Sequence, residues 1–252
     1  MNTSGNTILI TGGGSGIGRG LAEALHSLGN QVIVAGRRSS PLDSTMAASP
    51  GMQSVSLDLE KHDDIRTFAE SVIARFPKLN VLINNAGIMR PEHLNAERVD
   101  VAVAESIVIT NLLGPIRLTA ALLPHFKKQP RATIMNVSSG LAFVPFTLTP
   151  TYCATKAALH SYTQSLRYQL KSTKVEVLEL IPPYVATDLM GGAKDPRAMP
   201  LNEFHFRDNG DPEEPAYAGG DLCGAREGNS LCGRKRTLRW RVSGPEFGVS
   251  RL

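Results

Sequence analysis

Short apolar segments alternate with longer amphipathic segments along the first 200 residues of the chain. The apolar segments are rich in β-branched residues, which is typical of strands buried on both faces of a parallel sheet. The segments between them carry apolar residues at three- and four-residue spacing, which predicts helices that pack on the sheet. The predicted strands are residues 7–11, 31–35, 53–57, 81–84, 133–137 and 175–181. The predicted helices are residues 17–28, 63–76, 98–126 and 152–171.

The order of these elements predicts how the sheet is wound. Strands and helices alternate as βαβαβ, twice over, and crossovers between parallel strands are right-handed almost without exception. The economical topology is an α/β doubly wound parallel sheet, the Rossmann fold, with six strands in the order 3-2-1-4-5-6 and helices on both faces. Ligands of such sheets bind at the carboxyl ends of the strands.

The pattern ends near Leu201. Residues 202–252 contain eight glycines, eight basic and eight acidic residues, with no run of four apolar residues. This composition offers little apolar surface to offset the entropy of ordering, so we expect a poorly ordered tail without a recognisable seventh strand. The expected organisation is one folded domain over residues 1–201, followed by an atypical C-terminal tail over residues 202–252.

Composition places the chain among ordinary globular proteins, with 42% hydrophobic and 20% charged residues. Three scattered cysteines and the lack of a signal-like N-terminal segment predict a cytoplasmic location. No uninterrupted run of about 18 apolar residues points to a membrane, and a net charge of +4 does not indicate nucleic acid as a partner. The six histidines show no metal-binding spacing, so no metal site is predicted.

The first predicted strand runs into a glycine-rich turn that opens the first predicted helix, Thr11-Gly12-Gly13-Gly14-Ser15-Gly16-Ile17-Gly18. Missing Cβ atoms let the backbone approach a pyrophosphate, and the free N–H groups and helix dipole favour the anion. A glycine turn alone is weak evidence, but a strand before it and a helix after it favour a dinucleotide site. Gly12, Gly16 and Gly18 are the most important glycines of this loop.

The residues after the second predicted strand favour NADP(H) over NAD(H). A carboxylate there would accept hydrogen bonds from the ribose 2′-hydroxyl, whereas an arginine would pair with a 2′-phosphate. The chain has Gly36, then Arg37 and Arg38; the alternative is that both arginines are ordinary solvated loop residues. Asp58, after the third predicted strand, is placed to hydrogen-bond the adenine amino group, although Asp before a turn is also common for local reasons.

Tyr152 and Lys156 are four residues apart near the start of the last predicted helix and project from one face of it. An ammonium close to a phenol stabilises the phenolate and lowers the tyrosine pKa, which would prepare Tyr152 for acid-base catalysis near neutral pH. The pair alone arises readily by chance. Ser139, at the end of the fifth predicted strand, strengthens the interpretation because its hydroxyl would lie in the same crevice; the alternative is a capping or turn serine.

These features together resemble the short-chain dehydrogenase/reductase family, over about residues 5–200. Residues 139–160 are particularly similar to a bacterial branch of oxidoreductases from D-alanine esterification operons. The resemblance implies an oxidoreductase that moves a hydride between NADP(H) and a small-molecule carbonyl or alcohol. The matching motifs are the loop from Thr11 to Gly18, Asp58, Asn84-Asn85-Ala86-Gly87, Asn111, Ser139, Tyr152 and Lys156.

The resemblance also implies a role for each residue. Tyr152 donates a proton to the substrate oxygen or removes it, Lys156 lowers the Tyr152 pKa and binds the nicotinamide ribose, and Ser139 orients the substrate oxygen. Asn111 holds a water that links Lys156 to solvent; its alternative is a satisfied helix-interior amide. The implied cofactor-binding residues are Thr11, Gly12, Gly14, Ser15, Gly16, Ile17, Gly18, Arg37, Arg38, Asp58, Leu59, Asn85, Ala86, Gly87, Tyr152, Lys156, Pro182 and Thr187.

The C-terminal tail departs from the family pattern, in which a further helix and a seventh strand support tetramer contacts. We hypothesise that residues 202–252 derive from an alternative reading frame or an unrelated replacement, since two of the three cysteines and the only tryptophan lie there. The resemblance implies a homodimer through helices 98–126 and 152–171, and the tail disfavours a tetramer. The competing functional interpretation is a catalytically impaired dinucleotide-binding sensor or scaffold.

Overall fold

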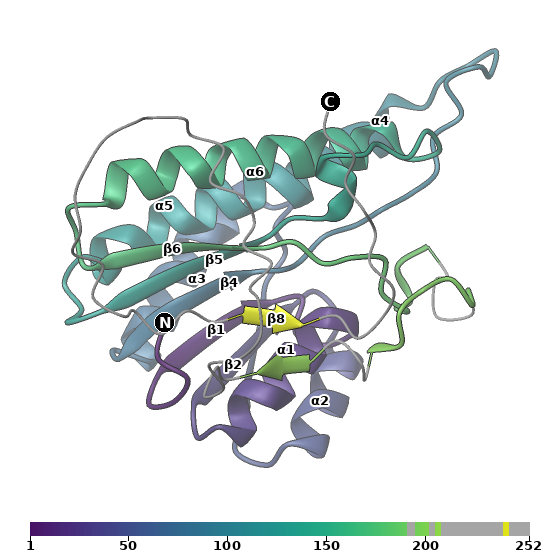
Figure 1. The fold of residues 1–252 in the computed structure, drawn as a ribbon. Coiled ribbons are helices and arrows are strands. Elements are labelled where there is room, and N and C mark those ends of the chain that lie inside the picture. Colours follow the sequence, from purple (N-terminus) through teal and green to yellow (C-terminus); the bar gives the residue numbers. More distant parts are fainter. Residues whose placement is uncertain (191–194, 202–204, 208–238, 242–252) are drawn as a thin grey trace, which may run out of the picture.

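The computed structural model describes residues 1–190, 195–201, 205–207 and 239–241 (Figure 1). Six parallel strands form one sheet in the order β3-β2-β1-β4-β5-β6. The predicted α/β doubly wound sheet and its strand order are therefore confirmed. The strands are β1 (Thr7–Thr11), β2 (Gln31–Gly36), β3 (Gln53–Ser56), β4 (Leu79–Asn84), β5 (Ala132–Val137) and β6 (Val175–Leu180).

Helices cover both faces of the sheet. They are α1 (Gly16–Ser27), α2 (Ser39–Ala48), α3 (His62–Arg75), α4 (Val101–Val108), α5 (Gly114–Phe126) and α6 (Pro150–Leu170), with a π-helical turn η1 (Ile109–Leu113) and a 3₁₀ turn η2 (Gly140–Ala142). Figure 1 shows α1 and α2 on one side of the sheet and α3, α5 and α6 on the other. This is the layering that the alternating sequence pattern predicts.

Two helical segments differ from the sequence-based prediction. Helix α2 was not predicted, because its sequence has no strong apolar stripe and only Leu42 and Thr45 are buried. The predicted helix over residues 98–126 begins instead at Val101, where the Asp100 side chain caps it by accepting a hydrogen bond from the Ala102 N–H at 3.0 Å. This helix is interrupted by η1, which contains Asn111.

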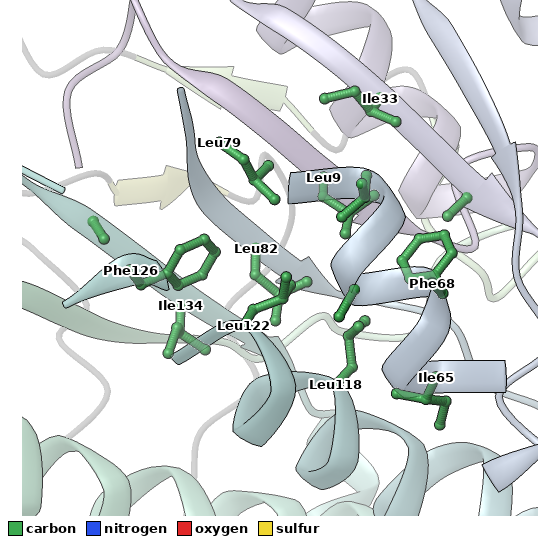
Figure 2. Packing of buried hydrophobic residues seen from close by; sticks show 14 of the residues in the cluster. Leu9, Ile33, Ile65, Phe68, Leu79, Leu82, Leu118, Leu122, Phe126 and Ile134 are labelled. Carbon is green, nitrogen blue, oxygen red and sulfur yellow. The ribbon is translucent and has the colours of Figure 1, made fainter. Parts of the chain in front are cut away.

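The hydrophobic core lies in two layers, one on each face of the sheet. Figure 2 shows the larger layer, where side chains from β1, β2, β4 and β5 meet those of α3 and α5. Leu82, Leu118 and Phe126 in this layer have no exposed surface. The second layer packs α1 and α2 on the opposite face, around Ile8 and Ile10 of β1. Burial on both faces explains why the strands read as continuous apolar runs.

Two short strands lie in the C-terminal tail. β7 (His205–Arg207) and β8 (Arg239–Arg241) pair with each other in antiparallel fashion and form a sheet separate from the parallel one. The sequence did not predict them. The hypothesis about the origin of residues 202–252, and the expectation that they are poorly ordered, fall mainly on positions outside the described residues.

The helical segment Val101–Phe126, which comprises α4, η1 and α5, is long and apolar enough to cross a bilayer, with a mean hydropathy of 1.6. Polar residues such as Glu105, Asn111 and Arg117 interrupt it, so the predicted lack of an uninterrupted apolar run holds for this segment. The same composition serves a core helix, because Leu118, Leu122 and Phe126 are buried against the sheet. Its hydrophobicity is thus accounted for by packing inside the domain.

Candidate active site

A cavity of about 1440 Å³ lies at the carboxyl ends of the parallel strands. It exceeds the roughly 300–1,000 Å³ of an ordinary ligand pocket, so it has room for a dinucleotide and a second molecule. Of the predicted site residues, all but Asn111 lie on its wall. These are Thr11, Gly12, Gly14, Ser15, Gly16, Ile17, Gly18, Arg37, Arg38, Asp58, Leu59, Asn85, Ala86, Gly87, Ser139, Tyr152, Lys156, Pro182 and Thr187.

The glycine loop joins β1 to α1 with a backbone that requires glycine. Gly12 and Gly16 have φ angles of 68° and 53°, which residues with a Cβ rarely adopt. A Cβ on Gly18 would lie 2.4 Å from the Gly12 carbonyl oxygen, so a larger residue would push the loop away from the helix. The Ser15 side chain makes no capping hydrogen bond at the start of α1. Gly16, Ile17 and Gly18, which open α1 without a side-chain cap from Ser15, line the cavity, and the start of a helix is a favourable position for an anion.

Thr11 and Asn85 line the cavity, but their side chains form hydrogen bonds with the backbone. Each side chain bonds to the segment that carries the other residue. The Thr11 hydroxyl accepts hydrogen bonds from the N–H groups of Asn85 and Ala86, both at 3.0 Å. The Asn85 amide donates to the Thr11 carbonyl oxygen at 2.9 Å. These bonds hold the loop after β4 against the glycine loop, so the two residues shape the site through the backbone.

Arg37, which follows β2, forms an ion pair with Glu60. Its Nη1 lies 3.0 Å from Glu60 Oε1, and the two side chains are 46% and 34% exposed. The same carboxylate oxygen also accepts hydrogen bonds from the hydroxyls of Ser106 and Thr110, at 3.0 and 3.2 Å. Sequence reasoning missed Glu60, because nothing in its neighbourhood indicates a contact with a residue 23 positions earlier.

Arg38 lies between two hollows of the surface. It lines the main cavity and also a smaller adjoining hollow of about 400 Å³, together with Ser15, Ser40 and Asp188. Asp58 lies on the wall of the main cavity, and its Oδ1 accepts a hydrogen bond from the Glu60 N–H at 3.1 Å. The edge of the cavity nearest β2 and β3 therefore combines two guanidinium groups with acidic neighbours.

Tyr152 lies in the first turns of α6 and is buried, with 6% of its surface exposed. Burial raises the pKa of Tyr152 to about 12, and the Ser139 hydroxyl opposes this rise. The sequence-based expectation was a lowered pKa caused by Lys156. For the protein chain alone this expectation is wrong, because the Lys156 nitrogen is 5.6 Å from the centre of the Tyr152 ring and desolvation of the phenolate dominates.

Lys156 is buried one turn further along α6, on the same face as Tyr152. Its Nζ donates a hydrogen bond to the Val137 carbonyl oxygen, the last residue of β5, at 2.7 Å. Burial lowers the pKa of Lys156 to about 8. The ammonium is thus fixed at the end of β5, on the wall of the cavity, and its pKa lies nearer to neutral pH than that of an exposed lysine.

Ser139 and Asn111 both make hydrogen bonds to backbone groups near this pair. The Ser139 hydroxyl accepts a hydrogen bond from the Leu141 N–H at 3.1 Å, so it also caps η2, as the alternative interpretation proposed. The Asn111 carboxamide bonds to both backbone groups of Ile88, each at 2.8 Å. Its side chain is therefore a satisfied amide, and it fixes the loop that carries Gly87 beside Lys156.

Glu92 is a further residue at this site that sequence reasoning missed. Its carboxylate accepts hydrogen bonds from the backbone N–H and the hydroxyl of Thr151, at 2.9 and 2.6 Å. Its own N–H donates to the Leu148 carbonyl oxygen at 2.9 Å. Glu92 therefore ties the loop after β4 to the residue that precedes Tyr152. No local sequence signal connects positions 59 residues apart.

No cluster of three or more metal-ligating side chains occurs among the residues that the structure describes. The expectation that the site works without a metal ion stays a prediction.

Comparison with known proteins shows which family the chain belongs to. The model of the short chain dehydrogenase family matches residues 6–198. The chain is a member of this family.

Two curated relatives illustrate the match. The uncharacterized oxidoreductase DltE of Bacillus subtilis is 40% identical over 199 residues, which cover 79% of each protein. This bears out the predicted similarity to oxidoreductases of D-alanine esterification operons. The NADP-dependent 3-hydroxy acid dehydrogenase of Schizosaccharomyces pombe is 32% identical over 193 residues, or 73% of each protein.

Solved structures share the fold and contain either dinucleotide. The 3-ketoacyl-(acyl-carrier-protein) reductase of Brucella melitensis, complexed with NADH, superposes with a TM-score of 0.73 at 29% identity, covering 80% of this chain and 88% of that one. A short chain dehydrogenase of Burkholderia cenocepacia in complex with NADP gives a TM-score of 0.70 at 27% identity, covering 81% and 82%. A nicotinamide dinucleotide is thus the cofactor type of this fold.

Proposed function

We propose that the protein is an NADP(H)-dependent oxidoreductase that interconverts a carbonyl group and an alcohol. The observation that carries the proposal is that Ser139, Tyr152 and Lys156 lie on the wall of one cavity with the glycine loop. Acid-base groups and an anion-binding backbone in one cavity fit a reaction in which a proton and a hydride are transferred together.

The residues present fit a dinucleotide that carries a 2′-phosphate. The glycine loop leaves backbone N–H groups at the N-terminus of α1 for the pyrophosphate. Arg37 and Arg38 directly follow β2, where the 2′-phosphate would be. Strand β2 itself contains no acidic residue that would repel this phosphate or bind a 2′-hydroxyl in its place. When bound, the cofactor supplies the hydride to the substrate carbon, or accepts it in the opposite direction.

Tyr152 handles the proton in this proposal. A phenol with a pKa of about 12 is protonated at neutral pH, so it is ready to donate its proton as the C=O bond of the substrate becomes a C–O bond. Ser139, which lowers the pKa of Tyr152 through its hydroxyl, is placed to donate a hydrogen bond to the same substrate oxygen. The Lys156 ammonium stabilises the phenolate that remains, and Tyr152 takes up a proton from solvent before the next reduction.

A direct assay tests this proposal. The purified chain is incubated with NADPH or NADH and a panel of aldehydes and ketones, and the loss of absorbance of the reduced nicotinamide is followed. We expect turnover with several carbonyl compounds and a higher kcat/KM with NADPH. Binding of NADPH without turnover of any carbonyl or alcohol would instead support the sensor or scaffold. The small-molecule partner, the homodimer and the cytoplasmic location also remain predictions from the sequence.

A further inference from the structure

We propose that the substrate is a hydrophobic ketone or secondary alcohol, with an apolar chain and few polar groups besides the reacting oxygen. This inference rests on the proposed function and concerns the half of the cavity that lies beyond Tyr152. Apolar side chains from three segments line this half: the loop after β4, the segment between β5 and α6, and the segment after β6. They are Met89, Leu141, Val144, Phe146, Leu148 and Tyr184.

Several of these side chains are much more exposed than apolar residues of this size usually are. Val144 is 70% exposed, Phe146 45% and Tyr184 47%. They line the same cavity as Tyr152 and together supply an apolar wall. Covering such a wall with an apolar ligand removes its surface from water, which favours binding in proportion to the area covered.

Three polar residues on the wall of the cavity, Tyr184, Asp195 and Arg197, are paired with one another. The Tyr184 hydroxyl donates to Asp195 Oδ2 at 3.1 Å, and the Arg197 guanidinium pairs with the same carboxylate at 2.7 Å. Arg90 also lines the cavity, at an exposed position. A polyhydroxylated substrate would lose hydrogen bonds to water here and would find few replacements, which disfavours sugars.

A homologous series of substrates tests the inference. The reduction of 2-alkanones from 2-butanone to 2-decanone is measured with NADPH and NADH, together with 1,3,4-trihydroxybutan-2-one as the polar counterpart of 2-butanone. We expect kcat/KM to rise about two- to fourfold for each added methylene until the wall is covered. The trihydroxy ketone is expected to react less efficiently than 2-butanone, its apolar counterpart of the same chain length.

A matched pair of variants separates the effect of a polar group on the apolar wall from general effects of the same substitution on the protein. Val144→Asn places a polar group on the wall, whereas Val99→Asn makes the same change at a residue that is 47% exposed and does not line the cavity. In Val144→Asn, kcat/KM for 2-octanone should fall at least fivefold while that for 2-butanone changes less than twofold. Val99→Asn should match the unmodified protein with both ketones.

A binding measurement distinguishes failure of this inference from failure of the proposed function. N-methyl alkanamides of increasing chain length imitate the ketones but are not reduced, and their Kd for the NADPH complex is measured by calorimetry. If no ketone is reduced but the Kd falls with chain length, the proposed function and the assignment of a ketone substrate fail, whereas the apolar preference of this half of the cavity stands. Turnover without dependence on chain length, preference for the trihydroxy ketone, or amide binding that ignores chain length would overturn the inference.

Discussion

The Glu92 carboxylate receives two hydrogen bonds from Thr151, one from its backbone N–H at 2.9 Å and one from its hydroxyl at 2.6 Å. Thr151 belongs to the first turn of α6 and directly precedes Tyr152. Glu92 therefore caps the helix that presents the proposed acid-base group, from a loop that is remote in sequence. A carboxylate at this end of a helix is also favoured by the helix dipole.

Replacement of Glu92 by alanine should weaken this end of α6. Two hydrogen bonds to a charged acceptor are lost and the Thr151 N–H is left without its partner, so we expect a destabilisation of about 1–3 kcal/mol. Turnover should fall more than cofactor affinity, since Tyr152 follows Thr151. Urea unfolding and steady-state kinetics measure the two effects.

Glu92→Gln, which keeps an acceptor oxygen, should restore part of both losses. Glu97→Ala, at an exposed position of the same loop, serves as the control, and equal behaviour of the two alanine variants would contradict the capping role.

Removal of the Tyr152 hydroxyl tests the proton donor. In Tyr152→Phe we expect kcat to fall by about 10²–10⁴-fold, the usual contribution of a general acid. The Kd for NADPH, measured by nicotinamide fluorescence, should change less than about threefold, because the glycine loop and the arginines are untouched. Tyr168→Phe, at an exposed position of α6, should leave both quantities unchanged. Retention of activity in Tyr152→Phe would remove this residue from the mechanism.

The strands and the glycine loop were predictable because their signals are local, and the strand order followed from the right-handed crossovers of parallel sheets. Each strand is a short run of β-branched residues, and the loop needs glycine at Gly12, Gly16 and Gly18 for reasons of backbone geometry. These features follow from neighbouring residues, so one sequence suffices to find them.

What escaped prediction depends on distant contacts or on burial. Glu92 meets Thr151 and Glu60 meets Arg37 only after the sheet has formed. The direction of the Tyr152 pKa shift was also missed, since spacing along a helix shows that an ammonium is near but not how strongly the phenol is desolvated. Helix α2 was missed because packing, more than its own sequence pattern, stabilises it.

The buried Lys156 should make stability depend on pH in the alkaline range. Burial lowers its pKa from 10.5 to about 8 in the folded protein, whereas the unfolded chain keeps the ordinary value. Between these two values the unfolded state binds one more proton, so the free energy of unfolding rises with pH by up to about 1.4 kcal/mol per pH unit. The gain is complete above pH 10.5 and is lost as the pH falls through about 8.

Denaturant unfolding between pH 8 and 10 measures this slope. The window ends at pH 10 because Tyr152, whose pKa is raised to about 12, contributes a slope of opposite sign above the ordinary value of tyrosine. Lys156→Met should remove the rise, while Lys128→Met, at an exposed position, should keep it. The same slope in both variants would show that Lys156 is not the titrating group.

Arg37 should decide between the two dinucleotides. In Arg37→Asp the guanidinium is replaced by a carboxylate, which would repel a 2′-phosphate and accept hydrogen bonds from a 2′-hydroxyl. The ratio of kcat/KM for NADPH over NADH is expected to fall at least tenfold. Arg66→Asp, an exposed change on α3 with the same alteration of net charge, should leave the ratio within twofold. An unchanged ratio in Arg37→Asp would exclude contact of Arg37 with the 2′-phosphate.

Glu60 adds a second determinant of cofactor choice, because its carboxylate forms an ion pair with the Arg37 guanidinium, with 3.0 Å between Oε1 and Nη1. In Glu60→Gln the charge is removed, while the amide oxygen still accepts hydrogen bonds from Ser106 and Thr110. A 2′-phosphate then no longer competes with a carboxylate for Arg37, and the preference for NADPH should rise about two- to fivefold.

The effect is small because both side chains are partly exposed and water screens the pair. It should shrink as salt is raised from 20 to 500 mM, and Glu70→Gln on α3, also exposed, should show no change. A fall in the NADPH preference of Glu60→Gln would mean that Glu60 aligns Arg37 for the phosphate and does not compete with it.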